Sequence, residues 1–270
     1  MKQKFGGIAF QMFAALMAVC LTLTPVYAKN EKNGSGETAA YNWYCCRTKN
    51  GEAPRLAPEF SFIRDHHCTF YNDHVAEGDR VIYLTFDAGY VNENVVSILD
   101  TLDAHGAKGA FFILDHVIEA SPDLVRRMAD SGHLVCNHTL RHRDMTKITD
   151  RAAFGAELSA LSDLYRECTG QEMPMFYRPP EGKFSPQNLT FADELGYTTV
   201  FWSFAYADWD NDRQPDCEAS LQKILRGTHN GEILLLHPTS ATNAAIIDRL
   251  LTAWEEQGYR FGSLDELVRK

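Results

Sequence analysis

From Val81 to the C-terminus, the chain alternates short apolar runs with longer amphipathic stretches. Short runs rich in Val, Ile, Leu and Phe predict buried strands, and the stretches between them predict helices. Strands that alternate with helices in series favour a parallel sheet, closed or nearly closed into a barrel. We therefore expect an α/β fold, a distorted (β/α)7 barrel. The seven expected strands span residues 81–86, 110–114, 134–137, 175–178, 198–204, 232–236 and 259–262.

Serine, proline and glycine indicate where the helices begin and end. Ser121 and Ser185 are expected to cap helices, because each precedes a proline that suits the first helical position, Pro122 or Pro186. Glycine adopts the left-handed conformation of a helix C-terminus without strain, so helices are expected to end at such residues. The candidates are Gly132, Gly170, Gly196, Gly231 and Gly258.

Residues 1–28 are typical of a signal peptide. Lys2 and Lys4 precede an uncharged, mostly apolar run at 8–23, and Val26 and Ala28 have the spacing of a cleavage site. The alternative is an uncleaved anchor, because the run approaches the roughly 17–25 residues that a membrane helix needs. We expect an exported protein, extracellular, in the cell wall or at the outer face of the membrane. It would contact the membrane only through this segment, if the segment is retained.

The remaining chain divides into three parts. Residues 29–40 are polar and contain glycine, so we expect a flexible linker. Residues 41–80 have an irregular pattern, and we interpret them as an N-terminal extension packed on a main domain at 81–270. The aromatic side chains available for that packing are Trp43, Tyr44, Phe60, Phe62, Phe70 and Tyr71.

Charge and cysteine content limit the choice of partners and compartment. Without Lys2 and Lys4, 24 of the 26 basic residues remain against 36 acidic ones, a formal net charge of −12. A nucleic-acid partner is not expected at that balance. In an exported segment, an even number of cysteines allows disulfides, but the interpretation that they are scattered buried thiols is favoured at least as much. The six cysteines are Cys45, Cys46, Cys68, Cys136, Cys168 and Cys217.

Polar residues follow most of the expected strands. In a β/α barrel the C-terminal ends of the strands meet at one rim, so these side chains are expected to converge. His138 and His142 have helical spacing, which would place both imidazoles on one face within reach of a divalent cation. A lone His or Asp at a strand end is more often a turn or capping residue, but several at corresponding positions favour a site. The six residues are Asp87, His138, His142, Arg178, Asp208 and His237.

Five motifs at these positions resemble, in order, those of the NodB-like polysaccharide deacetylases, carbohydrate esterase family 4. The resemblance covers residues 81–270 and is strongest to the sporulation-linked peptidoglycan N-acetylmuramic acid deacetylases. That branch is favoured by Asn42-Trp43-Tyr44, by the run at 201–210 and by His237-Pro238-Thr239-Ser240. The five motifs are Thr85-Phe86-Asp87-Ala88-Gly89, His138-Thr139-Leu140-Arg141-His142, Arg178-Pro179-Pro180-Glu181-Gly182, Asp208-Trp209 and Leu235-Leu236-His237.

The resemblance implies a catalytic role for four of these residues. Asp87 would be the general base that activates a water molecule, and Arg178 would hold its carboxylate in place. His237 would be the general acid that protonates the leaving amine, with Asp208 orienting its ring. A backbone amide near Glu181 would help to stabilise the oxyanion.

The implied metal site departs from the family pattern. By resemblance His138 and His142 would bind a divalent metal ion, Zn²⁺ or else Co²⁺, Mn²⁺ or Mg²⁺. The family usually adds an aspartate directly after the base, where this chain has Ala88, so metal affinity should be weaker. Asp115 and His116 follow the second strand and could substitute, but a helix-start role is favoured for them.

Four further residues are expected to contact the substrate, namely Tyr90, Glu181, Gly182 and Trp209. Many relatives carry Tyr where this chain has Glu181, which would change how the substrate fits. Trp209 stands beside Asp208 and is a candidate for stacking on a sugar. For Trp202 we favour a packing role.

The expected function is hydrolysis of the N-acetyl group on muramic acid in peptidoglycan glycan strands, which the resemblance links to muramic δ-lactam formation in spore cortex, and so to the forespore envelope. A close alternative is a deacetylase acting on N-acetylglucosamine polymers such as chitin oligomers. A non-catalytic wall-binding protein is a third reading, favoured only by Ala88.

Overall fold

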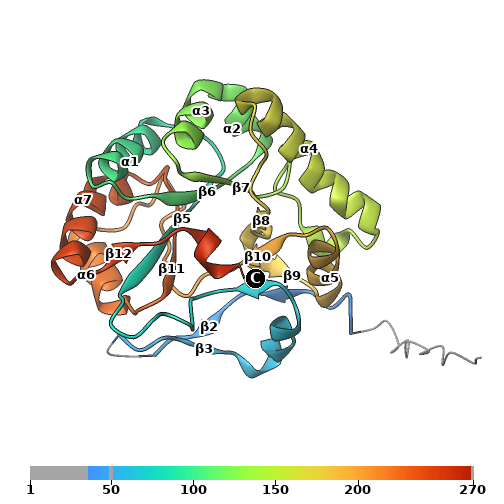
Figure 1. Ribbon diagram of the computed structural model, residues 1–270, viewed down its shortest axis with the longest axis horizontal. Coiled ribbons are helices and arrows are strands. Elements are labelled where there is room, and N and C mark those ends of the chain that lie inside the picture. Colours follow the sequence, from blue (N-terminus) through green and yellow to red (C-terminus); the bar gives the residue numbers. More distant parts are fainter. Residues whose placement is uncertain (1–35, 49–50, 269–270) are drawn as a thin grey trace, which may run out of the picture. The chain divides into compact units, whose positions relative to one another are not determined.

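A curved parallel sheet organises the molecule (Figure 1). The computed structural model describes residues 36–48 and 51–268. The strands of the sheet run in the order β11-β5-β6-β7-β8-β10-β4, and β12 lies off this path and pairs with the first two residues of β5. Every pairing in this sheet is parallel. The strands are β4 (Cys68–Thr69), β5 (Val81–Ala88), β6 (Gly109–Ile113), β7 (Leu134–Asn137), β8 (Phe176–Tyr177), β10 (Thr198–Val200), β11 (Glu232–Leu236) and β12 (Arg260–Phe261).

The expected α/β fold is confirmed, and the barrel is incompletely closed. All seven expected strands are present, but the fifth ends at Val200 instead of Phe204. After Val200 one further bond, from Phe201 N to Thr69 O, continues the pairing with β4, and the chain then turns toward β11, where Ser203 N donates to Ile233 O. A single parallel bridge between Phe204 and Leu234 brings this segment back to β11.

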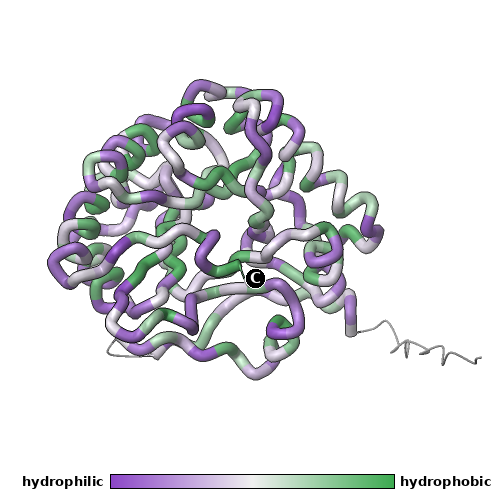
Figure 2. The backbone as a smooth tube through the Cα atoms, viewed as in Figure 1, coloured by the Kyte–Doolittle hydropathy of each residue, from purple (hydrophilic) through white to green (hydrophobic). Residues whose placement is uncertain are grey.

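Seven helices accompany the sheet in the described chain, and most connect consecutive parallel strands (Figure 1). One apolar cluster fills the space between the sheet and the helices, and a second fills the barrel interior. Hydrophobic segments accordingly follow the central strands, as Figure 2 shows. The helices are α1 (Glu93–Ala104), α2 (Asp115–Ala120), α3 (Pro122–Asp130), α4 (Arg151–Thr169), α5 (Pro186–Glu194), α6 (Cys217–Gly227) and α7 (Ala241–Glu256).

The expected helix caps are only partly correct. Ser185 Oγ accepts a hydrogen bond from Asn188 N at the start of α5, as expected. Ser121 is the N-cap residue of α3 and Pro122 its first residue, as expected, but the prediction of a side-chain cap was wrong, because Ser121 makes no such hydrogen bond. Ser121 also ends α2, and its N–H donates to Val117 O, so its backbone serves the preceding helix. At the end of α4, Gly170 has a φ of 74° and closes the helix through a bond to Arg166 O.

The segment at 41–80 is integrated with the main domain. It contributes β4 to the sheet, and β1 (Tyr41–Asn42) pairs antiparallel with β9 (Lys183–Phe184). A hairpin of β2 (Cys45–Cys46) and β3 (Arg55–Leu56) and the 3-10 helix η1 (Pro58–Asp65) complete it. Trp43 stacks on Phe201 with ring centroids 4.3 Å apart. The segment therefore supplies a strand as well as an aromatic cluster.

Three shorter 3-10 helices occur elsewhere: η2 (Met145–Lys147), η3 (Pro180–Gly182) and η4 (Leu264–Leu267). The six cysteines from Cys45 onward are all free thiols in the structure. Within the described ranges, no helix has the length and apolar character needed to cross a membrane. The predicted signal peptide and residues 29–35 of the predicted linker lie outside the described residues.

Candidate active site at the carboxyl rim of the sheet

A buried ion pair joins Asp87 and Arg178. Asp87 is the penultimate residue of β5, and Arg178 directly follows β8. Arg178 is fully buried, and its Nη1 donates to Asp87 Oδ1 at 2.8 Å. Its remaining donors reach Val200 O at 3.0 Å and Thr85 Oγ1 at 2.9 Å. The guanidinium is therefore fixed, and it holds the carboxylate in one orientation.

The surroundings of Asp87 keep it ionised. Burial alone would raise its pKa, but the charge and hydrogen bond of Arg178, together with His237, outweigh burial and lower the pKa of the carboxyl group. A carboxylate that stays charged while buried can accept a proton from a bound water.

His138 lies beside this carboxylate. Its Nδ1 donates to the backbone oxygen of Arg178 at 2.9 Å, which leaves Nε2 as an acceptor 3.7 Å from Asp87 Oδ2. Burial lowers the pKa of His138 to about 4, so the ring is neutral at physiological pH. A neutral imidazole whose other nitrogen is bound to a carbonyl is the usual arrangement of a metal-ligating histidine.

The prediction that His138 and His142 lie on a helix was wrong, because they lie on a loop. Thr139 and His142 have φ values of 72° and 53°, which no right-handed helix allows. Local side chains stabilise this path: Asn137 Oδ1 accepts from Thr139 N, and Thr139 Oγ1 accepts from His142 N. The two rings nevertheless lie close together, with centroids 5.0 Å apart.

These residues could hold a metal ion, but they offer it few protein ligands. In the described chain, no three His, Cys, Asp or Glu side chains form a metal-binding cluster. Ala88 offers only a buried methyl group, and Asp115 is the first residue of α2, with Oδ1 accepting from His116 N. The free Nε2 of His138 and the nearby ring of His142 remain as nitrogen donors. They fit a cation that keeps several waters in its coordination sphere.

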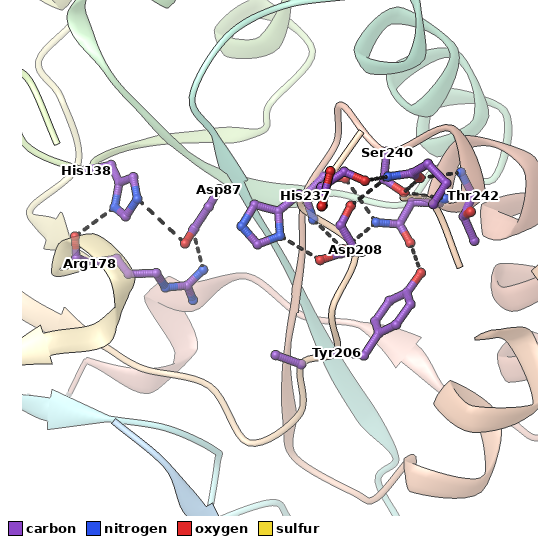
Figure 3. A network of polar contacts seen from close by, with 12 residues as sticks. Asp87, His138, Arg178, Tyr206, Asp208, His237, Ser240 and Thr242 are labelled. Carbon is purple, nitrogen blue, oxygen red and sulfur yellow. Dashed lines mark hydrogen bonds and ion pairs between the residues drawn. The ribbon is translucent and has the colours of Figure 1, made fainter. Parts of the chain in front are cut away.

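A second pair, His237 and Asp208, occupies the same rim (Figure 3). His237 directly follows β11, and its Nδ1 lies 2.7 Å from Asp208 Oδ1. The backbone N–H of His237 donates to Asp208 Oδ2 at 2.8 Å. Burial alone would lower the pKa of His237, but the hydrogen bond and charge of Asp208 outweigh burial and raise the pKa. This imidazole is therefore suited to carry a proton.

The expected substrate residues differ in their exposure. Trp209 is 61% exposed, and its ring centroid lies 6.1 Å from that of His237. Tyr90 is 45% exposed, and its hydroxyl oxygen accepts from Asn211 Nδ2. Both aromatic rings are thus accessible, and that of Trp209 lies next to His237. Trp202 instead packs against two apolar clusters, as expected.

Glu181 and Gly182 lie in the short 3-10 helix η3, which Pro179 separates from Arg178. Glu181 has a φ of 56°, and its exposed carboxylate accepts from Lys183 Nζ at 2.6 Å. A Cβ at Gly182 would lie 2.7 Å from the Trp202 ring, so only glycine fits there. Glu181 therefore points to solvent and pairs with a cation, a role that the sequence did not indicate.

Two buried residues, one that contacts the His237 pair and one behind it, were not given this role by the sequence analysis. Asn243 in α7 donates to Asp208, and the hydroxyl of Tyr206 contacts Asn243. A polar residue in the first turn of a helix is usually exposed, so the sequence did not indicate that Asn243 is buried at this site.

Comparisons with known proteins agree with this geometry. A sequence model of the polysaccharide deacetylase family matches residues 74–200. The chain is 35% identical to the peptidoglycan N-acetylmuramic acid deacetylase PdaA of Bacillus subtilis, over 84% of this chain and 85% of that protein. It is 33% identical to the peptidoglycan N-acetylglucosamine deacetylase PgdA of Listeria monocytogenes, over 71% of this chain and 40% of that protein.

A solved structure extends the match to three dimensions. The structure of Bacillus subtilis PdaA, a family 4 carbohydrate esterase, superposes with a TM-score of 0.80 at 33% identity. The match covers 85% of this chain and 97% of that one. With the parallel sheet and the convergence of the five motifs at one rim, these similarities show that the chain belongs to the polysaccharide deacetylase family, carbohydrate esterase family 4, a family of amide hydrolases.

Proposed function

We propose that this protein hydrolyses the N-acetyl groups of amino sugars in peptidoglycan, with N-acetylmuramic acid as its preferred sugar. The observation that carries this proposal is the pairing at one rim of a carboxylate bound by Arg178, which lowers its pKa, and an imidazole bound by Asp208, which raises its pKa. Amide hydrolysis needs one group that takes a proton and another that gives one.

The two residues divide the reaction between them. Asp87 takes a proton from a water molecule, whose oxygen attacks the acetyl carbonyl carbon. His237 then gives its proton to the amide nitrogen as the carbon–nitrogen bond breaks, and acetate and a free amine leave. The backbone amide near Glu181 is proposed to donate to the oxyanion.

His138 and His142 would hold a divalent cation at this rim. Such an ion polarises the carbonyl oxygen and lowers the pKa of bound water. Its identity among Zn²⁺, Co²⁺, Mn²⁺ and Mg²⁺ is left to experiment, because two imidazoles with waters suit several ions.

Trp209 and Tyr90 are proposed to contact the sugar. Their exposed rings lie next to His237 and Asn211, and aromatic rings stack well on the apolar faces of sugars. Gly182 is proposed to act through its backbone, because its missing side chain lets the turn after Arg178 pack on Trp202 and keep its position beside the substrate.

The preference for muramic acid is supported by the similarity to PdaA across most of both chains. The second candidate is deacetylation of N-acetylglucosamine, supported by the similarity to PgdA of Listeria monocytogenes. Purified peptidoglycan should be treated with the enzyme, digested to disaccharides and examined by mass spectrometry. Loss of acetyl from muramic acid, or its δ-lactam, supports the proposal, whereas loss only from glucosamine favours the alternative.

Export and a role in spore cortex are further parts of the proposal. They are supported by the charge and apolar pattern of residues 1–28 and by the resemblance to sporulation-linked deacetylases. Mass spectrometry of the mature N-terminus from sporulating cells tests export, and a chain that begins at Met1 in the cytoplasmic fraction would contradict it.

A further inference from the structure

Asn243 lies in the first turn of α7 and is fully buried against the His237–Asp208 pair. Its Nδ2 donates to Asp208 Oδ2 at 2.6 Å and to the backbone oxygen of His237 at 3.0 Å. One amide group thus contacts both members of the pair.

The orientation of this amide is determined by its neighbours. A carboxylate and a carbonyl oxygen can only accept, so the NH2 group of Asn243 must face them. Its Oδ1 then faces Tyr206, whose hydroxyl donates at 2.5 Å. Tyr206 is itself buried, so this bond is shielded from water. The hydrogen bonds that link Tyr206 through Asn243 to Asp208 and His237 therefore all run in one donor-to-acceptor direction (Figure 3).

Asn243 completes the set of hydrogen bonds to the carboxylate. Asp208 Oδ1 receives His237 Nδ1, while Oδ2 receives His237 N and Asn243 Nδ2. The two donors on Oδ2 prevent rotation of the carboxylate away from the imidazole. Among the described residues, only His237 would orient the side chain of Asp208 without Asn243.

The side chain of Asn243 is not needed to start the helix. Ser240 caps α7 through its Oγ, which accepts from the backbone N of Asn243. Gln214 Oε1 in turn accepts from Ser240 Oγ at 2.5 Å and from Thr242 N at 3.1 Å. The helix start is thus held by other groups, and the amide is available for the active-site pair.

We propose that Asn243, oriented by Tyr206, is a positioning residue that holds Asp208 and His237 in the geometry needed for proton delivery to the leaving amine. This inference rests on the proposed function of the same site. It adds two residues that lie outside the five sequence motifs.

The experiment compares Asn243→Leu and Tyr206→Phe with the control Tyr83→Phe in the full-length protein. Tyr83 is also buried and its hydroxyl accepts from Asn72, but it lies on β5 in the register of Ile233, away from the rim. Acetate release from glycan strands that contain N-acetylmuramic acid gives kcat and KM. NMR of the His237 Nδ1–H proton reports the bond to Asp208 independently of activity.

For Asn243→Leu we expect kcat to fall about 10- to 100-fold with KM within about twofold of wild type, because binding residues are untouched. Tyr206→Phe should lower kcat less, and Tyr83→Phe should not change it. The Nδ1–H signal should shift or disappear in the first two variants only.

Unchanged kcat and an unchanged Nδ1–H signal in Asn243→Leu would overturn the inference. If that variant does not fold, the same two readouts on Tyr206→Phe decide. If the wild type releases no acetate, the proposed function fails, and the NMR signal alone decides whether Asn243 positions the pair. A rise in KM with unchanged kcat would also overturn the inference, because it indicates a substrate contact.

Discussion

Asp208 accepts two hydrogen bonds from His237, one from the ring Nδ1 at 2.7 Å and one from the backbone N–H at 2.8 Å. The carboxylate of Asp208 is fully buried, so it accepts hydrogen bonds from the histidine and not from solvent. This arrangement fixes the ring and favours its protonated form. The opposite member of the site, Asp87, has its pKa lowered next to Arg178, so the pKa values of the two proposed catalytic groups are shifted in opposite directions, each toward the charged form.

The alkaline limb of the activity profile should depend on Asp208. His237 must be protonated to act as an acid, and its pKa is raised, so activity should persist above pH 6.5 and fall as pH rises through the raised pKa. Asp208→Asn removes the charge and should move that limb to lower pH. The measurement is kcat against pH, with Asp210→Asn in the same loop as the matched control. An alkaline limb at the same pH in both variants would contradict the assignment.

Metal removal should lower activity. With two imidazoles and no third clustered ligand in the described chain, affinity should be weaker than that of a site with three protein ligands, so dialysis against a chelator should strip the ion. Deacetylation should fall and should return when Zn²⁺, Co²⁺, Mn²⁺ or Mg²⁺ is added. His138→Ala should lower the affinity for the added ion in calorimetry. Full activity in protein shown by elemental analysis to be metal-free would contradict the prediction.

Glu232→Gln should stabilise the fold near neutral pH. Glu232 is fully buried, Oε2 accepts from His229 N, and Oε1 has no hydrogen-bond partner among the described residues. Burial raises its pKa to about 8 from 4.5. Between these values the folded state binds a proton that the unfolded state has lost, so stability falls as pH rises through this window.

Glutamine resembles the protonated acid and has no such pH dependence. The gain in unfolding free energy should be on the order of 3 kcal/mol at pH 7 and near zero at pH 4. Urea unfolding at both pH values measures it, with the exposed Glu256→Gln as control. An equal effect at both pH values would show that Glu232 is not protonated in the fold.

Trp43→Ala should strongly destabilise the protein. Trp43 is buried, stacks on Phe201, and donates from Nε1 to Trp202 O at 2.9 Å. Loss of a buried tryptophan costs about 3–5 kcal/mol. The neighbouring Tyr44 is half-exposed, so Tyr44→Ala should cost about 1 kcal/mol. If urea unfolding gave similar values for both, the N-terminal segment would not be integral to the domain.

Much of the fold and site could be predicted because the signals are local. The apolar runs located β5 to β7 and β11, and the residues that end them placed Asp87, His138 and His237 at one rim. The same argument placed Arg178 and Asp208 there, and the family motifs gave the roles of these two residues, whose contacts join distant parts of the chain.

The features that could not be predicted depend on contacts between distant residues or on special backbone geometry. β4 has only two residues and exists because β10 pairs with it. The helical spacing of His138 and His142 was misleading, because Asn137 and Thr139 stabilise a loop through side-chain bonds to the backbone. The role of Asn243 could not be predicted, because its contact with Asp208 depends on how α7 packs in the fold.

The central claim is that Asp87 initiates hydrolysis at the rim where His237 completes it. The most direct test is acetate release from purified peptidoglycan by the wild type and by Asp87→Asn, with thermal unfolding of both proteins. We expect the variant to lose at least about 100-fold in rate, the usual contribution of a general base, while it remains folded. A folded Asp87→Asn variant that releases acetate at the wild-type rate would contradict the account.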